Sequence, residues 1–216
     1  MRKHPPTGGK TLRHRGSAKE RAGRVPQGQA EQKPAKTIVL VGMMGSGKTA
    51  VGTALARMLG VPFLDSDHEI ERAAQMSVAE IFARDGEPFF RDREAEVLLR
   101  LLSGPPAVVS TGGGAFLSER NRGAIAKLGV SVWLRADLEL LWNRVRHKNT
   151  RPLLRTADPR QTLANLLEQR APLYSLAQVV VDAEHGLPIE KMAQKVIRAL
   201  EVRGDVFAEA PQERTS

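Results

Sequence analysis

The chain of 216 residues contains no cysteine, and aromatic residues make up only 4% of it. The absence of cysteine excludes a disulfide scaffold, a cysteine-based zinc site and a thiol nucleophile. No apolar run reaches the roughly 20 residues that a membrane-spanning helix needs, and the N-terminus lacks the apolar stretch of a secretory signal. With 41% hydrophobic and 26% charged residues, we expect a soluble cytoplasmic protein that builds its core without cross-links.

The net charge of +9 is distributed very unevenly along the chain. Residues 1–36 hold ten basic and two acidic residues, a net charge of +8, which leaves +1 for the rest. This segment is rich in Pro, Gly and Gln and has few large apolar side chains, so it cannot bury enough surface to fold. We predict a disordered basic extension with no dedicated nucleic-acid partner. An arm for RNA or acidic partners and a transit peptide are the alternatives.

Between residues 37 and 201, short β-branched runs alternate with longer stretches of helical period. This order predicts one α/β domain with a parallel sheet covered by helices. Residues 202–216 are polar again and are expected to form a short C-terminal tail. The runs expected to be strands are 37–41, 62–64, 107–109, 130–134 and 178–181, and the clearest helical stretches are 50–59, 138–146 and 189–200.

A glycine-rich segment directly follows the first predicted strand. Residues 42–49 read GMMGSGKT and fit the pattern G-x-x-x-x-G-K-[ST]. In such a loop, backbone N–H groups surround phosphate oxygens at the N-terminus of the next helix. Lys48 would neutralise charge between the β- and γ-phosphates, and the Thr49 hydroxyl would bind Mg²⁺. The sequence therefore predicts a nucleoside triphosphate site but does not identify the phosphate acceptor.

Two carboxylates, Asp65 and Asp67, come at the end of the second predicted strand. This is the edge of the sheet where ligands of open α/β proteins lie. If the chain stays extended, alternation puts both side chains on one side. One could hold Mg²⁺ through water while the other orients or deprotonates a hydroxyl that attacks the γ-phosphate. The alternative is that Asp67 only caps the following helix.

Two further features could bind an anionic substrate. Arg91 and Glu94 lie three residues apart on a predicted helix, so they form either a surface ion pair or an anion-binding arginine held by a carboxylate. Gly112, Gly113 and Gly114 follow the third predicted strand. They either let backbone amides approach a ligand closely or make a tight turn.

Together with R-P-L-L at 151–154 and R-A-P-L-Y at 170–174, these segments resemble the shikimate kinase family in their order and spacing. The resemblance covers about residues 37–200. It implies a three-layer P-loop kinase fold with a five-stranded parallel sheet flanked by helices, a substrate-binding segment at about 66–95 and a lid at about 146–160. It also implies transfer of the γ-phosphate of ATP to the 3-hydroxyl of shikimate, with Mg²⁺, by a monomer that serves aromatic amino acid biosynthesis.

The resemblance also implies roles for single residues of the acceptor site. Asp65 would assist the metal through water together with Thr49, and Asp67 would bind the shikimate hydroxyls as the catalytic base. Arg91, Arg170 and the backbone of the glycine triplet Gly112 to Gly114 would bind shikimate itself.

For the nucleotide, the resemblance implies that Arg151 lies on the lid over the phosphates. Arg144 would stack on adenine, with Arg146 as the alternative two residues away. The residues expected to bind ATP are Gly45, Ser46, Gly47, Lys48, Thr49, Ala50, Arg144 and Arg151.

Two other functions are compatible with parts of the sequence. A gluconate-kinase-like enzyme also combines a P-loop with a small acidic substrate, but it does not account for all the motifs jointly. A nucleic-acid-associated protein would use the basic extension. The folded part, however, is nearly neutral and lacks the paired aromatic residues of an RNA-binding sheet.

Overall fold

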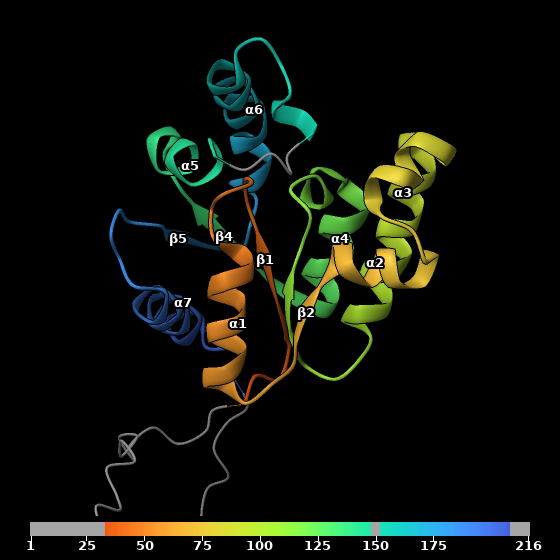
Figure 1. Ribbon diagram of the computed structural model, residues 1–216. Coiled ribbons are helices and arrows are strands. Elements are labelled where there is room, and N and C mark those ends of the chain that lie inside the picture. The colour runs from red at the N-terminus through yellow and green to blue at the C-terminus, as the bar shows by residue number, and fades with distance from the viewer. Residues whose placement is uncertain (1–32, 148–151, 208–216) are drawn as a thin grey trace, which may run out of the picture. The chain divides into compact units, whose positions relative to one another are not determined.

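The computed structural model describes residues 33–147 and 152–207, which hold five strands and seven α-helices (Figure 1). The strands are β1 (Thr37–Val41), β2 (Phe63–Asp65), β3 (Val108–Ser110), β4 (Gly129–Arg135) and β5 (Val179–Asp182). The helices are α1 (Lys48–Leu59), α2 (Ser66–Ala74), α3 (Val78–Leu102), α4 (Glu119–Leu128), α5 (Leu138–Val145), α6 (Pro159–Tyr174) and α7 (Ile189–Arg203). Short 3₁₀ turns cover Ala115–Leu117 and Pro152–Leu154.

The five strands form one parallel sheet in the order β2-β3-β1-β4-β5. The central strand β1 is fully buried, and its side chains alternate between two apolar clusters. Ile38 and Leu40 face the cluster that includes α1 and α7, whereas Val39 and Val41 face the cluster that includes α3 and α4. A parallel sheet needs such cover on both faces because the crossover helices lie there. The predicted three-layer α/β fold is therefore confirmed.

The parallel order brings the carboxyl ends of β1, β2 and β3 to one edge of the sheet. Asp65 pairs with Ser110 across β2 and β3, and Leu40 of β1 pairs with the same serine. The phosphate-binding loop, the two aspartates and the glycine triplet follow these three ends directly. Segments far apart in the sequence thus meet at the edge where α/β proteins bind ligands.

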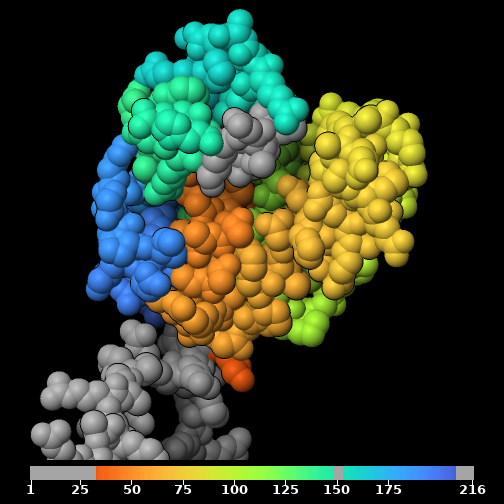
Figure 2. All heavy atoms as spheres, in the orientation of Figure 1, coloured from red at the N-terminus to blue at the C-terminus, as the bar shows by residue number. Residues whose placement is uncertain are grey.

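Helices α2 and α3 form a lobe beside α1, and Figure 2 shows this lobe at the right, with α5 and α6 at the top. Ser77 and Glu80 form a capping box at the start of α3. Gly86, with φ 81° and ψ 173°, breaks the helical geometry inside α3, and Pro88 follows it. The second half of α3 is therefore a separate helical segment after a kink, and it carries Arg91 and Glu94.

The two ends of the described chain pair with each other. The N–H of Ala35 donates to the carbonyl of Val206 at 2.8 Å, and Pro34 and Phe207 form an isolated antiparallel bridge. Lys36 binds Asp205 at 2.9 Å. Ordered contacts therefore extend beyond the expected limits of 37 and 201. Within the described residues, no helix is long and apolar enough to cross a membrane.

Candidate active site

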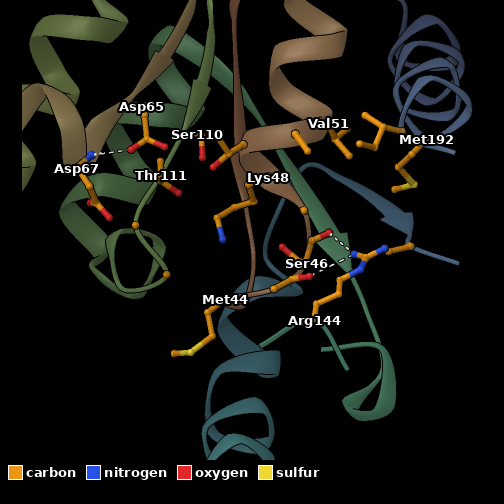
Figure 3. A pocket seen from close by; sticks show the side chains of 18 of the residues that line it. Met44, Ser46, Lys48, Val51, Asp65, Asp67, Ser110, Thr111, Arg144 and Met192 are labelled. Carbon is orange, nitrogen blue, oxygen red and sulfur yellow. Dashed lines mark hydrogen bonds between the residues drawn. The ribbon is translucent and has the colours of Figure 1, made fainter. Parts of the chain in front are cut away.

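A cavity of about 550 Å³ opens at the carboxyl ends of β1 to β3. Figure 3 shows Lys48 in its middle, with Asp65 and Asp67 on one side and Ser46 and Arg144 on the other. Every described residue predicted to bind nucleotide or metal lines it, and so do Gly112 and Gly113. Its apolar wall includes Leu187, Ile189 and Met192, which come after β5 and were not predicted from the sequence. The remaining residue of the nucleotide set, Arg151, lies outside the described residues.

The phosphate-binding loop needs glycine at three positions because its backbone enters a region that other residues avoid. Gly42, Gly45 and Gly47 have φ of 136°, 84° and 100°. A β-carbon on Gly45 would also lie 2.8 Å from Val145. The Lys48 ammonium donates to the carbonyls of Gly42 at 2.9 Å and Met43 at 3.1 Å. This holds the positive charge over the loop, at the N-terminus of α1 where phosphate binds.

Arg144 of α5 closes the loop from the opposite side. Its Nη1 donates to the carbonyls of Gly45 and Ser46, both at 3.2 Å. Arg146 is the exposed residue at the C-terminal cap of α5 and does not line the cavity. Of the two arginines between which the sequence left a choice, Arg144 is the one at the phosphate-binding loop.

The chain around Asp65 and Asp67 is not extended as predicted from the sequence. Helix α2 begins at Ser66, and Asp65 is its N-cap, with Oδ1 accepting from the N–H groups of Asp67 at 3.1 Å and His68 at 3.4 Å. The alternation argument is therefore wrong, and so is the alternative that Asp67 caps the helix. Both carboxylates nevertheless line the cavity, because one ends a strand and the other lies in the first helical turn.

Asp67 has the electrostatic environment of a proton acceptor. Burial and then the charge of Asp65 raise its pKa, and Lys48 opposes this only in part. A carboxylate with a raised pKa is a stronger base than an ordinary aspartate. It lies against Gly112, where a β-carbon would be 2.6 Å from Asp67 Oδ1. The N–H of Gly112 donates to the Ser66 hydroxyl at 3.3 Å, which links the start of α2 to the triplet.

Arg91 is held by two carboxylates on α3. Its Nη1 donates to Glu94 Oε2 at 2.9 Å, while Nε and Nη2 donate to Glu87 Oε1 at 3.2 and 2.9 Å. The Glu94 side chain is only 1% exposed, so this is not a surface ion pair. Burial raises the pKa of Glu94, and Arg91 opposes this shift only in part. For Arg91, burial lowers the pKa, but the two carboxylates Glu94 and Glu87 outweigh it, so the pKa is raised overall.

The glycine triplet lies against the predicted substrate-binding side chains, one glycine to each. A β-carbon would lie 2.6 Å from Asp67 at Gly112, 3.5 Å from Arg170 at Gly113 and 2.7 Å from Arg91 at Gly114. None of the three has a positive φ. Gly112 and Gly114 therefore lack space for a β-carbon, whereas Gly113 has room for one. The segment also turns, because the N–H of Ala115 donates to the carbonyl of Gly112 at 3.2 Å, so the tight turn is present together with the close approach to side chains.

Arg91 and Arg170 do not line the cavity itself. Arg170 lies beside Gly113, which lines it, and Arg91 lies beside Gly114, the next residue in the chain. Arg170 lies on α6, whose last residue, Tyr174, donates a hydrogen bond to the carbonyl of Gly113. Glu87, Ser66 and Tyr174 also contribute contacts here, and no role was predicted for them from the sequence. The spacing of four residues from Glu87 to Arg91 and from Arg170 to Tyr174 was the available signal.

Three buried side-chain oxygens in the described part of the chain have no hydrogen-bond partner: Ser46 Oγ, Asp67 Oδ1 and Glu94 Oε1. Buried polar atoms are nearly always paired, so each exception needs a physical reason. Ser46 and Asp67 line the cavity, and Glu94 binds Arg91 beside it. Their clustering indicates a site whose hydrogen bonds are completed by a polar ligand.

The donor set also fits Mg²⁺ bound with a nucleotide. This ion keeps several waters and usually takes only one or two protein oxygens besides the phosphates. Thr49 and Asp65 both line the cavity, and the backbone bonds of Asp65 fall on Oδ1, which leaves Oδ2 for a metal-bound water.

Comparisons of this chain with known proteins all point to the same family. The family model for shikimate kinase matches residues 44–201. A shikimate kinase of Ruegeria pomeroyi is 67% identical over 172 residues, 80% of this chain and 88% of that protein. One of Cereibacter sphaeroides is 64% identical over 172 residues, 80% of this chain and 86% of that protein. A solved shikimate kinase from Acinetobacter baumannii, in complex with shikimate, is 41% identical with a TM-score of 0.73, covering 78% of this chain and 94% of that one.

Proposed function

The chain belongs to the shikimate kinase family, and from that premise we propose that Asp67, Arg91 and Arg170 form the acceptor site of an ATP:shikimate phosphotransferase. The enzyme uses ATP and Mg²⁺ to convert shikimate into shikimate 3-phosphate, with ADP as the second product. The observation that carries the assignment of the site is the glycine triplet, which brings one base and two guanidinium groups to the rim of a phosphate-binding cavity.

The nucleotide half of the cavity holds the phosphoryl donor. Backbone N–H groups of the loop at 42–49 and the N-terminus of α1 bind the phosphates, and Lys48 moves from the loop carbonyls to the β- and γ-phosphates. Thr49 would hold Mg²⁺ directly and Asp65 would hold it through a bound water, and the ion would neutralise phosphate charge. Arg144 keeps the far side of the loop in place through the carbonyls of Gly45 and Ser46.

In the acceptor half, Asp67 orients the 3-hydroxyl and accepts its proton as the oxygen attacks the γ-phosphorus. The new bond joins this oxygen to phosphorus, and the bond between phosphorus and the bridging oxygen of ADP breaks. Arg91 and Arg170 bind the carboxylate of shikimate, since guanidinium groups match a carboxylate in charge and geometry. Glu94, fixed beside Arg91, keeps that guanidinium aimed at the triplet.

Transfer to a small hydroxyl also requires that water be excluded from the γ-phosphate. We assign this role to a lid at about 146–160, with Arg151 over the phosphates, as the family resemblance implies. The substrate-binding segment is 66–95, inside a catalytic domain of about 37–201, with an extension at 1–36 and a tail at 202–216. As the family resemblance implies, we propose a monomer, and we place the enzyme in the cytoplasm without a nucleic-acid partner.

The test is an ADP-release assay on the purified full chain with shikimate, quinate, gluconate and nucleoside monophosphates as acceptors. We expect Mg²⁺-dependent turnover with shikimate and little with the others. Gluconate and nucleoside monophosphates have no ring carboxylate for the two arginines, and quinate carries an additional hydroxyl on the carbon that bears its carboxylate. Turnover with gluconate in place of shikimate would favour the gluconate-kinase-like alternative, and absence of turnover with every acceptor would overturn the assignment.

A further inference from the structure

Tyr174 is the only tyrosine of the chain, and it is completely buried beside the acceptor site. It ends α6, four residues after Arg170, so the two side chains leave the same face of the helix. Its hydroxyl donates to the carbonyl oxygen of Gly113 at 2.5 Å. A β-carbon on Gly113 would lie 3.5 Å from Arg170 Nη1 and 3.7 Å from the Tyr174 hydroxyl oxygen, so the phenol and the guanidinium meet at this glycine. The phenol hydrogen serves Gly113, and the oxygen keeps its acceptor positions.

The rest of the Tyr174 side chain is held just as firmly. The hydroxyl oxygen lies 3.9 Å from the Met43 sulfur in the phosphate-binding loop. Because its hydrogen already serves Gly113, this is a packing contact. The ring packs against Trp133 of β4, with 5.9 Å between the ring centroids. One side chain of α6 thus contacts the glycine triplet, the phosphate-binding loop and β4.

The protonation state of Tyr174 is consistent with donation to Gly113. Burial raises the pKa of the phenol, and the charge of Arg170 offsets this only in part. The hydroxyl therefore keeps its proton at neutral pH and does not form an ion pair with Arg170.

We propose that the Tyr174 hydroxyl is a positioning group of the acceptor site, which fixes the Arg170 guanidinium and the Gly113 backbone relative to each other before the substrate binds. The inference rests on the proposed function, because Arg170 is taken to bind the substrate carboxylate. A long arginine side chain loses conformational freedom when it binds a ligand, and ordering it in advance lowers that cost. Tyr174 therefore acts on shikimate affinity through Arg170, without touching the reacting atoms.

The substitution Tyr174→Phe tests this, because it removes one oxygen and keeps the ring that packs on Trp133. We expect the KM for shikimate to rise about tenfold, the free-energy equivalent of about 1.4 kcal/mol. The kcat should fall by less than about threefold. The KM for ATP should stay unchanged, because Lys48 and the phosphate-binding loop keep their own contacts.

A matched control is Ser131→Ala, which removes another buried hydroxyl. Ser131 lies in β4, and its hydroxyl donates a hydrogen bond to the side chain of Gln178, just before β5. It should lower the melting temperature without changing either KM. A KM for shikimate within twofold of the parent in Tyr174→Phe would overturn the inference, and so would equal losses for shikimate and ATP. The parent enzyme separates the failures: if it shows no shikimate-dependent turnover, the proposed function fails first.

A second measurement does not depend on the variant folding. Because Tyr174 is the only tyrosine, incorporating 3-fluorotyrosine gives one ¹⁹F resonance that reports this position alone. Saturating shikimate should shift the resonance, because carboxylate binding changes the charge balance of Arg170 at the phenol oxygen. An unchanged resonance in an enzyme that still turns over shikimate would show that Tyr174 is not coupled to substrate binding.

Discussion

Gly112 and Gly114 have no room for a methyl group, because each faces a functional side chain at less than 3 Å from its would-be β-carbon. Gly112→Ala would displace the Asp67 carboxylate, and Gly114→Ala would displace the Arg91 guanidinium. We expect the first to lower mainly kcat and the second to raise mainly the KM for shikimate, each by about 10- to 100-fold, since small misplacements of reacting groups are costly. Steady-state kinetics with both substrates measures the split.

The control for both substitutions is Gly123→Ala on α4. No atom lies within 4 Å of its would-be β-carbon, and alanine is a better helix former than glycine. This variant should keep both constants and melt slightly higher than the parent. If Gly112→Ala also kept kcat and both KM values, the spacing argument for the triplet would be wrong.

Asp67→Asn should lower the activity of the enzyme and raise its thermal stability. Loss of the base should lower kcat by about 10²- to 10⁴-fold, while ATP binding is retained. The pKa of Asp67 is raised above its ordinary value of 3.8 on folding, so the folded protein holds this proton more tightly than the unfolded chain does. At neutral pH the ionised carboxylate therefore opposes folding, and we expect Asp67→Asn to melt about 2–5 °C higher.

The pH dependence gives the sign of the Asp67 effect. The stability difference between the variant and the parent should appear as the pH rises above 3.8, reach its full size above the folded pKa, and vanish in more acidic solution. In the parent, kcat/KM should fall on the acid side at a pH higher than an ordinary aspartate would give. Equal losses of ATP affinity and turnover in Asp67→Asn would instead show a structural role for this residue.

At the scale of elements, the described chain ends are joined by an exposed cluster around Asp205. Asp205 accepts from Lys36 at 2.9 Å and from Arg203 at 2.6 Å. The bonds to Arg203 and then Lys36 lower its pKa to about 2. The cluster ties the segment before β1 to the end of α7, next to the Ala35 to Val206 backbone bond.

We expect Asp205→Asn to lower the melting temperature by about 1–2 °C at low salt, and about 1 M NaCl to remove the difference by screening. Because the pKa of Asp205 falls from 3.8 to about 2 on folding, the contribution is present above pH 3.8 and is lost as the pH falls through 2. Asp92→Asn is the control, since its carboxylate lies 3.7 Å from Arg120 in a looser surface pair. Equal shifts in both variants, measured by differential scanning fluorimetry, would contradict a specific role for the Asp205 cluster.

Prediction of the elements succeeded where the sequence pattern was strong and failed at a boundary. The strand–loop–helix order around residues 37–59 was predicted correctly because the β-branched run and the glycine motif are both local signals. The start of α2 was missed, because Asp65, Ser66 and Asp67 are each common at helix N-termini and at strand ends. Only the backbone bonds to Asp65 Oδ1 decide which of them is the cap.

At the scale of the whole molecule, all predicted site residues come after residue 44, whereas residues 1–36 carry +8 of the net charge of +9. A deletion of residues 1–32 removes eight basic and two acidic residues but keeps Pro34, Ala35 and Lys36. We expect kcat and both KM values to stay within about twofold, because the cavity and the glycine triplet draw only on later residues.

The longer deletion of residues 1–36 is the matched comparison. It also removes the bonds of Ala35 and Lys36 to Val206 and Asp205, so it should melt lower than the shorter deletion while keeping the same KM values. A fall of tenfold or more in kcat/KM for the shorter deletion would show that the basic extension takes part in catalysis.

By itself, the sequence determined the fold class, the phosphate-binding loop and the family, because each depends on residue types at short, fixed spacings. Only the tertiary structure shows which groups meet: Arg144 and not Arg146 lies at the loop, and Tyr174 reaches Gly113 from 61 residues away. Each glycine of the triplet lies against a different one of the side chains that we propose for the acceptor site. These contacts depend on the order of the strands and the placement of α3 and α6. Their physical basis is close packing of groups distant in sequence, which no local pattern of residues encodes.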